Sequence, residues 1–181
     1  MKGLIVFSTN MEDGEALATR ALLVRAGFEM DSMTFEKSKG IVTSFGLHVK
    51  TDFLSKDIEY NQYDFIVIPG GKYVSETIDQ NDNIQNLAKK FHEADKVIAA
   101  ICAGPRFLGR AGLLNDVHFT AYPQSENDAP KGYYHPERKA MTDGKIITAR
   151  GAGAVVEFVY EIVKYFQKEE KAISLIRSIL F

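Results

Sequence analysis

The chain lacks the features that mark membrane proteins and nucleic-acid-binding proteins. Among its 181 residues, no apolar run approaches the roughly 20 residues that a membrane-spanning helix needs. Its formal net charge is -2, so there is no excess of positive charge to attract nucleic acid or an anionic membrane surface. We therefore expect neither nucleic acid nor a membrane as a partner.

Cysteine is nearly absent, because Cys102 is the only one in the chain. A single cysteine excludes an internal disulfide, which is typical of a reducing compartment. The first apolar stretch, Leu4 to Phe7, is too short for the core of a signal peptide and predicts a first strand instead. We expect a cytoplasmic protein that forms one globular domain over residues 1–181, with 45% hydrophobic residues to build its core.

Short apolar runs alternate with segments of helical spacing. The predicted strands are Leu4–Phe7, Phe28–Phe35, Asp64–Ile68, Val97–Ile101, Val117–Ala121 and Lys145–Thr148. The predicted helices cover Asp13–Gly27, Ile84–Phe91, Val155–Phe166 and Ile173–Leu180. A hairpin is expected through Ile41–Val42 and Leu47–Val49, and a long loop over Tyr122–Asp143. This order predicts an α/β fold, an open doubly wound and mostly parallel sheet with helices on both faces.

Cys102 follows the buried strand Val97–Ile101 at a point where the chain turns sharply into a helix. The small Ala103 and Gly104 permit a tight turn, and Pro105 suits a first helical turn. Such a turn would place the sulfur at a helix N-terminus, where unpaired N–H groups stabilise a thiolate. The alternative is that Cys102 is a small buried apolar residue, as many lone cysteines are. We favour a reactive cysteine.

Two further strand ends should converge on the same crevice as Cys102. Glu12, Asp13 and Glu15 follow the first strand and offer carboxylates that can accept protons. For Glu12 and Asp13, capping of the next helix is the preferred interpretation. Gly70 and Gly71 follow the third strand, and their N–H groups, with that of Ala103, are candidates for an oxyanion hole.

Taken together, these motifs make the chain resemble the DJ-1/ThiJ/PfpI superfamily, and specifically its DJ-1-like branch. The resemblance rests on motifs spread over nearly the whole chain, which are Ala99–Pro105, Ile68–Gly71, Glu15, Thr148–Gly153 and Glu157-Phe158. It implies a flavodoxin-like fold, a homodimer, and a glutamate, here Glu15, that hydrogen-bonds the nucleophilic Cys102. A protonated Glu15 would favour a thiolate and an ionised one would repel it, so the pKa of Glu15 should be raised.

One position departs from a pattern found in this superfamily. Many DJ-1-like proteins with proposed glyoxalase or deglycase activity carry a histidine where this chain has Tyr122, before Pro123. A tyrosine can exchange hydrogen bonds but is a poor base at neutral pH. Two outcomes are therefore open: either Glu15 handles the protons alone, or the activity is weak.

No cofactor or metal is expected. The four histidines show no metal-ligand spacing, and they are His48, His92, His118 and His135. His135 lies in the long loop and is expected to be exposed and structural. The turn Arg150–Gly153 resembles a phosphate-binding turn but lacks the full dinucleotide pattern. Arg25 could hold an anion near the site, although a solvated helix charge is the preferred interpretation.

These residues predict a cysteine-dependent enzyme that acts on 2-oxoaldehydes or glycated amines, with Cys102 as nucleophile and Glu15 as proton carrier. The alternative is an oxidative-stress sensor or chaperone-like protein in which Cys102 is oxidised and turnover is negligible. Peptidase activity is disfavoured, because the PfpI branch carries a histidine directly after its cysteine and this chain has Ala103. For the expected homodimer, the first helix with Leu17, Leu22 and Val24 is one contact surface.

Overall fold

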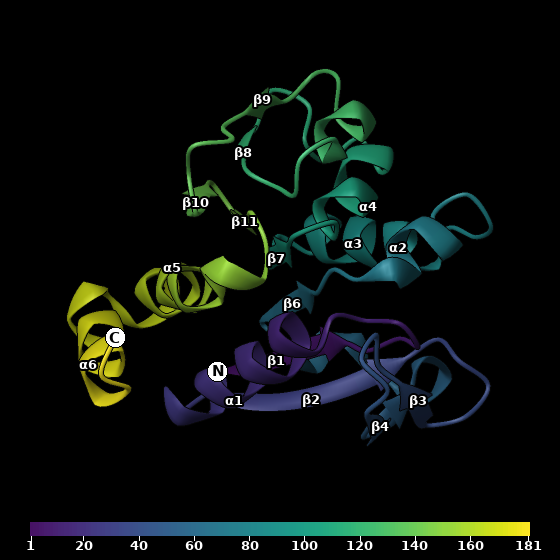
Figure 1. Ribbon diagram of the computed structural model, residues 1–181, viewed down its shortest axis with the longest axis horizontal. Coiled ribbons are helices and arrows are strands. Elements are labelled where there is room, and N and C mark those ends of the chain that lie inside the picture. Colours follow the sequence, from purple (N-terminus) through teal and green to yellow (C-terminus); the bar gives the residue numbers. More distant parts are fainter.

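A seven-stranded sheet forms the centre of the protein (Figure 1). The computed structural model describes residues 1–181 and orders the strands β10-β11-β7-β6-β1-β2-β5. All neighbours are parallel except β10 and β11. The strands of this sheet are β1 (Lys2–Val6), β2 (Glu29–Thr34), β5 (Phe53–Leu54), β6 (Phe65–Ile68), β7 (Val97–Ile101), β10 (Ala140–Asp143) and β11 (Ile146–Ala149). The mostly parallel sheet predicted from the sequence is confirmed.

Helices cover both faces of this sheet, as Figure 1 shows. On one face α3 contacts β6 and β7 and packs against α4, and on the other α5 contacts β7 and β11 and packs against α1 and α6. The helices are α1 (Thr19–Arg25), α2 (Lys72–Thr77), α3 (Asn83–Glu93), α4 (Pro105–Arg110), α5 (Val155–Gln167) and α6 (Glu169–Ser178). The fold is therefore the doubly wound, flavodoxin-like α/β sandwich that the resemblance implies.

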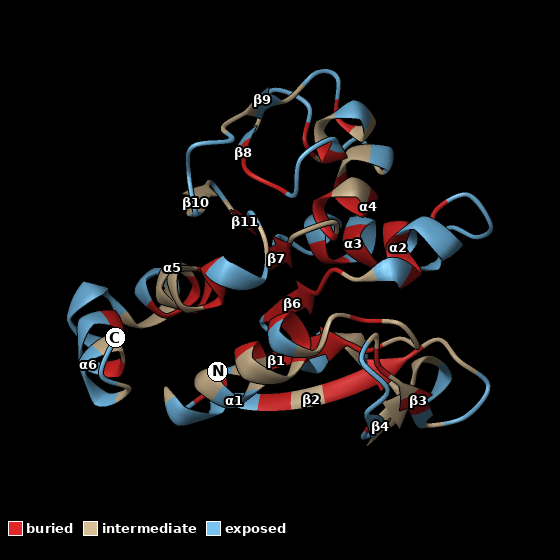
Figure 2. Ribbon diagram, viewed as in Figure 1, coloured by how far each residue is buried: buried red, intermediate tan, exposed pale blue.

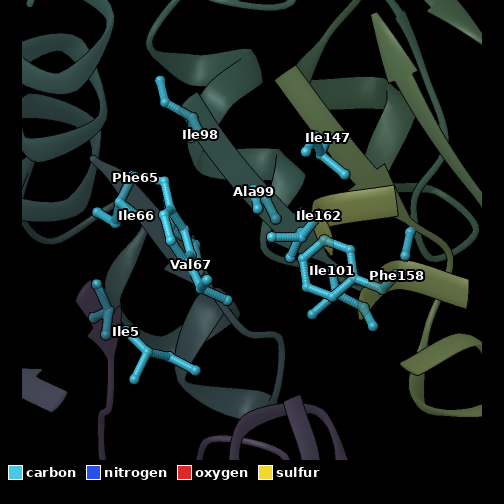
Figure 3. Packing of buried hydrophobic residues seen from close by; sticks show 14 of the residues in the cluster. Ile5, Phe65, Ile66, Val67, Ile98, Ala99, Ile101, Ile147, Phe158 and Ile162 are labelled. Carbon is cyan, nitrogen blue, oxygen red and sulfur yellow. The ribbon is translucent and has the colours of Figure 1, made fainter. Parts of the chain in front are cut away.

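The central strands are apolar because both of their faces are covered. Every residue of β6, β7 and β11 is buried, and Figure 2 shows these strands as the buried centre of the molecule. In Figure 3, Phe158 and Ile162 of α5 lie beside Ile101 at the end of β7. Burial of each such side chain contributes roughly 1.5–3 kcal/mol. The end of β7, where Cys102 follows, is thus held rigidly.

The helix predicted from Asp13 begins with an unusual turn. Residues Gly14–Ala18 form a π-helix, and α1 continues from Thr19 to Arg25 before Gly27 ends it. A π-helical turn adds a residue to the ordinary helical repeat and is frequent at functional sites. Here it carries Glu15, whose side chain is directed into the protein and only 1% exposed.

The predicted hairpin is confirmed. Strands β3 (Gly40–Val42) and β4 (His48–Lys50) pair in antiparallel fashion outside the main sheet, with Ile41 opposite Val49. Asp13 holds this hairpin, because its carboxylate accepts from the Thr43 hydroxyl at 2.6 Å and from the Phe45 N–H at 3.3 Å. The expectation that Asp13 caps the first helix was therefore wrong.

The strand predicted over Val117–Ala121 was too long. Only β8 (His118–Phe119) is extended, and it pairs with β9 (Tyr133–Tyr134) in a small separate sheet. After β8, the backbone no longer pairs with a strand, because the Thr120 N–H donates to a side-chain oxygen, Thr148 Oγ1, at 2.9 Å. The predicted loop Tyr122–Asp143 contains β9 and β10, which are too short to form an apolar run that the sequence would reveal.

None of the helices combines the length and the apolar character that crossing a membrane requires.

Candidate active site

Cys102 occupies a strained elbow between β7 and α4. Its φ of 63° lies in the left-handed region, which costs a residue with a side chain roughly 1–2 kcal/mol. Neighbouring chain segments hold it there, because Cys102 N–H donates to Ala149 O and Cys102 O accepts from Tyr122 N–H, both at 2.8 Å. The side chain is half-buried and lines a cavity. Pro105 stands at the start of α4, as predicted.

Glu15 reaches Cys102 from the π-helical turn. Its buried carboxyl hydrogen-bonds the Cys102 thiol, and its Oε2 accepts from Gly70 N–H at 3.0 Å. Glu12 supports this placement by capping, because its Oε2 accepts from the Glu15 N–H at 2.6 Å. The capping interpretation of Glu12 is confirmed. The structure therefore brings Glu15 and Cys102 together, as the family resemblance implies.

Gly70 lies between these two groups rather than beside a substrate. A Cβ at this position would come within 2.6 Å of both Cys102 Cβ and Glu15 Oε2, so only glycine fits. Its N–H is occupied by Glu15 and it does not line the cavity. The expectation that Gly70 donates to an oxyanion was therefore wrong. Its place in the site is to hold the carboxyl of Glu15 against the sulfur.

Gly71 and Ala103 remain as candidate donors to an oxyanion. Both line the cavity, and neither N–H donates to any oxygen of the chain. The Ala103 N–H instead points to the Cys102 sulfur, where it lowers the pKa of the thiol. Two N–H groups beside one nucleophile are the minimal form of an oxyanion hole.

The pKa of Glu15 is raised to about 7, mainly because burial disfavours its charged form. The thiol of Cys102 and the N–H groups of Gly70 and Ala152 lower it, while the nearby charge of Glu12 raises it. A carboxyl of this kind exchanges its proton near neutral pH. The turn Arg150–Gly153 thus contributes the Ala152 N–H to Glu15.

The thiol of Cys102 is not activated by its surroundings alone. Burial raises its pKa above the ordinary value, and an ionised Glu15 raises it further. The Ala103 N–H opposes this, but α4 has only six residues and adds little field. The expectation of a thiolate stabilised by the helix was therefore too simple. The sulfur ionises more easily while Glu15 keeps its proton than after Glu15 has lost it, so the two groups compete for one negative charge.

The cavity beside Cys102 has a volume of about 540 Å³ and a polar lining. It is lined by Glu12, Gly71, Lys72, Ser75, Cys102, Ala103, Arg106, Tyr122, Pro123, Gln124, Ser125, Asn127 and Asp128. Arg106 is fixed in its wall, since Nε donates to Asp128 Oδ2 at 2.5 Å and an NH group donates to Ser75 Oγ at 3.0 Å. The cavity therefore suits a small polar ligand.

Tyr122 stands at the rim of this cavity, where its side chain is 56% exposed. Its backbone N–H bonds Cys102, and its ring lies close to Gly151. The phenol can contact a substrate but is not buried in the way that a tuned base would be. Arg25 does not line the cavity and is exposed at the end of α1, which agrees with a solvated charge.

The histidines are not all scattered, contrary to expectation. His118 Nδ1 and His135 Nε2 lie 2.8 Å apart, joined by the pairing of β8 with β9. Neither lines the cavity at Cys102, and His48 and His92 are exposed. No group of three or more histidine, cysteine, aspartate or glutamate residues is arranged to bind a metal.

Sequence reasoning missed Tyr73 and Asp128. The Tyr73 ring is 1% exposed behind the site, its hydroxyl donates to Pro69 O at 2.6 Å, and burial raises its pKa. Asp128 accepts from both Arg106 and Arg110 and so braces the cavity wall. Asp128 stood in a polar loop with no periodicity, and the only usable signal was the spacing of the two arginines on one face of α4.

Residues 1–165 match the model of the DJ-1/PfpI family. The chain belongs to this family. Among its curated relatives, Protein DJ-1 homolog B of Arabidopsis thaliana is 32% identical over 98% of this chain and 40% of that protein. Deglycase PfpI of Pyrococcus furiosus is 30% identical over 91% of this chain and 98% of that protein. Glutathione-independent glyoxalase DJR-1.2 of Caenorhabditis elegans is 27% identical over 93% of this chain and 89% of that protein.

Solved structures of the family superpose closely. Oxidised Toxoplasma gondii DJ-1 matches with a TM-score of 0.89 at 29% identity, over 99% of this chain and 98% of that one. By contrast, the chain spans only about two fifths of the two Arabidopsis relatives, at 40% and 44% of their lengths. Family membership and fold follow from these likenesses, and relatives at this distance are named as deglycases and a glyoxalase.

Proposed function

We propose that the protein is a cofactor-independent enzyme that converts 2-oxoaldehydes, or the adducts they form with amines, through covalent attachment to Cys102. The main observation that supports this proposal is the contact between the Cys102 thiol and a buried Glu15 whose pKa is about 7. A nucleophile within reach of a group that titrates at neutral pH is the usual arrangement for covalent catalysis. The names of the Pyrococcus and C. elegans relatives support this chemistry.

In the proposed first step, the Cys102 sulfur attacks the aldehyde carbon of a molecule such as methylglyoxal. The new C–S bond forms as the C=O π electrons move to oxygen, and the Gly71 and Ala103 N–H groups stabilise the resulting oxyanion. Glu15 then donates its proton to this oxygen, which gives a hemithioacetal and leaves Glu15 ionised. Glu15 holds its own proton during the attack, because an ionised carboxylate beside the sulfur would disfavour the thiolate.

In the second step, the ionised Glu15 removes the proton from the former aldehyde carbon and returns it to the neighbouring carbon, while the hydroxyl proton passes from the oxygen of the first carbon to that of the second. This transfer turns the hemithioacetal into a thioester of a 2-hydroxy acid, with no net oxidation. Water then hydrolyses the thioester and releases lactate and free Cys102. A carboxyl with a pKa of about 7 suits both directions of this transfer.

The cavity allows more than the smallest substrate. Its 540 Å³ lies in the range of pockets that bind small organic molecules, whereas methylglyoxal has the bulk of only a few waters. Glu12 and Lys72 add charged groups at its wall. Glycated amino acids, which carry charges of both signs, would fill this space better.

We expect Cys102→Ser to lower kcat/KM for methylglyoxal by at least about 1000-fold, because the hydroxyl is a far weaker nucleophile. The measurement is lactate formation by purified protein, resolved into its two enantiomers. The wild type should produce one enantiomer in excess. Equal turnover by Cys102→Ser, or a racemic product matching heat-denatured protein, would exclude this mechanism.

The second candidate is a redox sensor, which the half-buried, accessible sulfur favours. The related Toxoplasma structure is that of an oxidised DJ-1. Mass spectrometry after mild peroxide treatment separates the two functions. Selective addition of two oxygens to Cys102, together with lactate formation no faster than in Cys102→Ser, would support the sensor over the enzyme.

We also propose a homodimer formed through the first helix. Val24 is 46% exposed on α1, while Leu17 and Leu22 are partly buried against the core. Light scattering after gel filtration should give a mass of twice the 20.2 kDa chain. The Val24→Asp variant should have the mass of a single chain. An unchanged mass in Val24→Asp would rule out this surface.

A further inference from the structure

The pair of histidines outside the active site has no role in the proposed reaction. His118 lies on β8 and His135 follows β9, and Figure 1 places these two strands together, away from the β7–α4 elbow. Their Nδ1 and Nε2 atoms are hydrogen-bonded at 2.8 Å while the ring centroids are 5.1 Å apart, so these two nitrogens are the nearest atoms of the two rings that can bind an ion. We propose that this pair is a binding site for a divalent transition-metal ion, and specifically for Cu²⁺.

The backbone fixes the spacing of the two rings before any ion binds. His118 is opposite Tyr133 in the β8–β9 pairing, and His135 N–H donates to Phe119 O at 2.8 Å. The His118 ring also stacks on Tyr133 with centroids 4.7 Å apart. Ligands that are held in place lose little conformational freedom on binding, which raises affinity.

A carboxylate lies beside the second ring of the pair. Glu137 Oε1 lies 3.4 Å from His135 Nδ1, which leaves Nε2 of the same ring directed to His118. This is the carboxylate–histidine arrangement that supports metal ligands in proteins. One of the two hydrogen-bonded nitrogens carries a proton, which moves to the other nitrogen of its own ring when the ion binds, so no net proton is released.

The surroundings favour a cation. The histidines open into a hollow of about 470 Å³ that is lined by Asp143 and Glu161 as well as Arg138. With Glu137, three carboxylates stand against one guanidinium. Two of the carboxylates already accept hydrogen bonds, Asp143 from the backbone N–H of His118 and Glu161 from the Thr142 hydroxyl. Water would complete the coordination in this open hollow.

The distance between the nitrogens selects the kind of ion. Metal–imidazole bonds of about 2.0–2.1 Å put two ligands about 2.9 Å apart when they meet at a right angle, and about 3.4 Å apart in a tetrahedron. The two nitrogens are hydrogen-bonded to each other at 2.8 Å, so the ion has to replace this bond, and the right-angled arrangement of tetragonal Cu²⁺ or Ni²⁺ requires the smallest change in their spacing. Imidazole ligands also exclude Mg²⁺ and Ca²⁺, which prefer oxygen, and Cu²⁺ binds such sites more tightly than Ni²⁺.

The test is titration with CuCl₂, followed by calorimetry and electron paramagnetic resonance. It is done in the Cys102→Ser background, because a free thiol would bind or reduce copper. We expect one tight site whose resonance spectrum shows two nitrogen ligands. Adding His118→Gln or His135→Gln should weaken this binding at least about tenfold, and Glu137→Gln about tenfold.

His92→Gln is the matched control, since His92 is exposed on α3 and has no histidine partner. It should leave the affinity unchanged, while saturating copper should raise the thermal midpoint of the Cys102→Ser protein but not of its His135→Gln derivative. Circular dichroism and urea unfolding without copper verify that each variant folds. If folded His135→Gln binds copper as tightly as its parent, or if the spectrum shows no imidazole nitrogen, the site does not exist.

Discussion

The Glu15→Gln variant is expected to be more stable than the wild type at pH 8, by about 3 kcal/mol, and equally stable near pH 4. Glu15 is 1% exposed, and burial raises its pKa to about 7 from an ordinary 4.5. Each pKa unit corresponds to about 1.4 kcal/mol, which gives the expected difference. Glutamine keeps the shape and the acceptor for Gly70 N–H but carries no charge to bury.

The pH dependence of this effect has a definite sign. Below about pH 4.5, Glu15 is protonated in both the folded and the unfolded chain, so it does not lower the free energy of unfolding relative to glutamine. Between pH 4.5 and 7 the unfolded chain loses the proton while the folded protein keeps it, and the free energy of unfolding falls. Above pH 7 the full cost is reached. Urea denaturation of both proteins at pH 4, 6 and 8 measures it.

The same variant separates the two roles of Glu15. Its kcat for methylglyoxal should fall by about 10²–10⁴-fold, because an amide cannot carry a proton between carbons. Alkylation of Cys102 by iodoacetamide at pH 8 should be at least as fast as in the wild type, because glutamine never places a negative charge beside the sulfur. Glu93→Gln, an exposed carboxylate on α3, is the control and should change none of these quantities. A stability gain that is the same at pH 4 and pH 8 would disprove the buried-charge explanation.

The elbow was predictable from sequence because its determinants are local. An apolar run, two small residues and a proline fix a strand, a turn and a helix start, and Cys102 lies where they require. The alternation of strands and helices was predictable for the same reason, since covered strands such as β6 must be apolar throughout. The approach of Glu15 to Cys102 came from the family resemblance and not from periodicity, because a π-helical turn has no sequence pattern of its own.

The parts that escaped prediction depend on contacts between distant segments. His118 and His135 are 17 residues apart and meet only through the pairing of β8 with β9, two residues long in each strand. Gly70 looked like a donor to substrate, yet its N–H was taken by a residue 55 positions earlier. The pKa of the Cys102 thiol could not be predicted from the sequence either. Burial raises it and one N–H group lowers it, and the balance between them depends on the packed structure.

Replacement of Gly71 by alanine tests how tightly the two halves of the site are joined. Gly71 has a φ of 127° and forms a bridge with Met11, in the segment that leads to Glu15. A Cβ here would lie 2.4 Å from Asn10 O and 2.5 Å from Glu12 N, and both are backbone atoms that cannot rotate away. We therefore expect Gly71→Ala to lower the free energy of unfolding by at least about 3 kcal/mol, from backbone strain and overlap together.

Gly46→Ala is the matched control for this substitution. Gly46 also has a positive φ, at 86°, but a Cβ added there would meet no atom within 4 Å. It should therefore show the strain alone, about 1–2 kcal/mol, and leave turnover unchanged. Gly71→Ala should in addition separate Glu15 from Cys102, because relief of the overlap displaces the Met11 segment away from the elbow. Urea denaturation gives the two stabilities and lactate formation the activity. If the two variants lose the same unfolding free energy, the Met11 segment moves aside without cost. Glu15 is then not held in place by the Gly71 bridge.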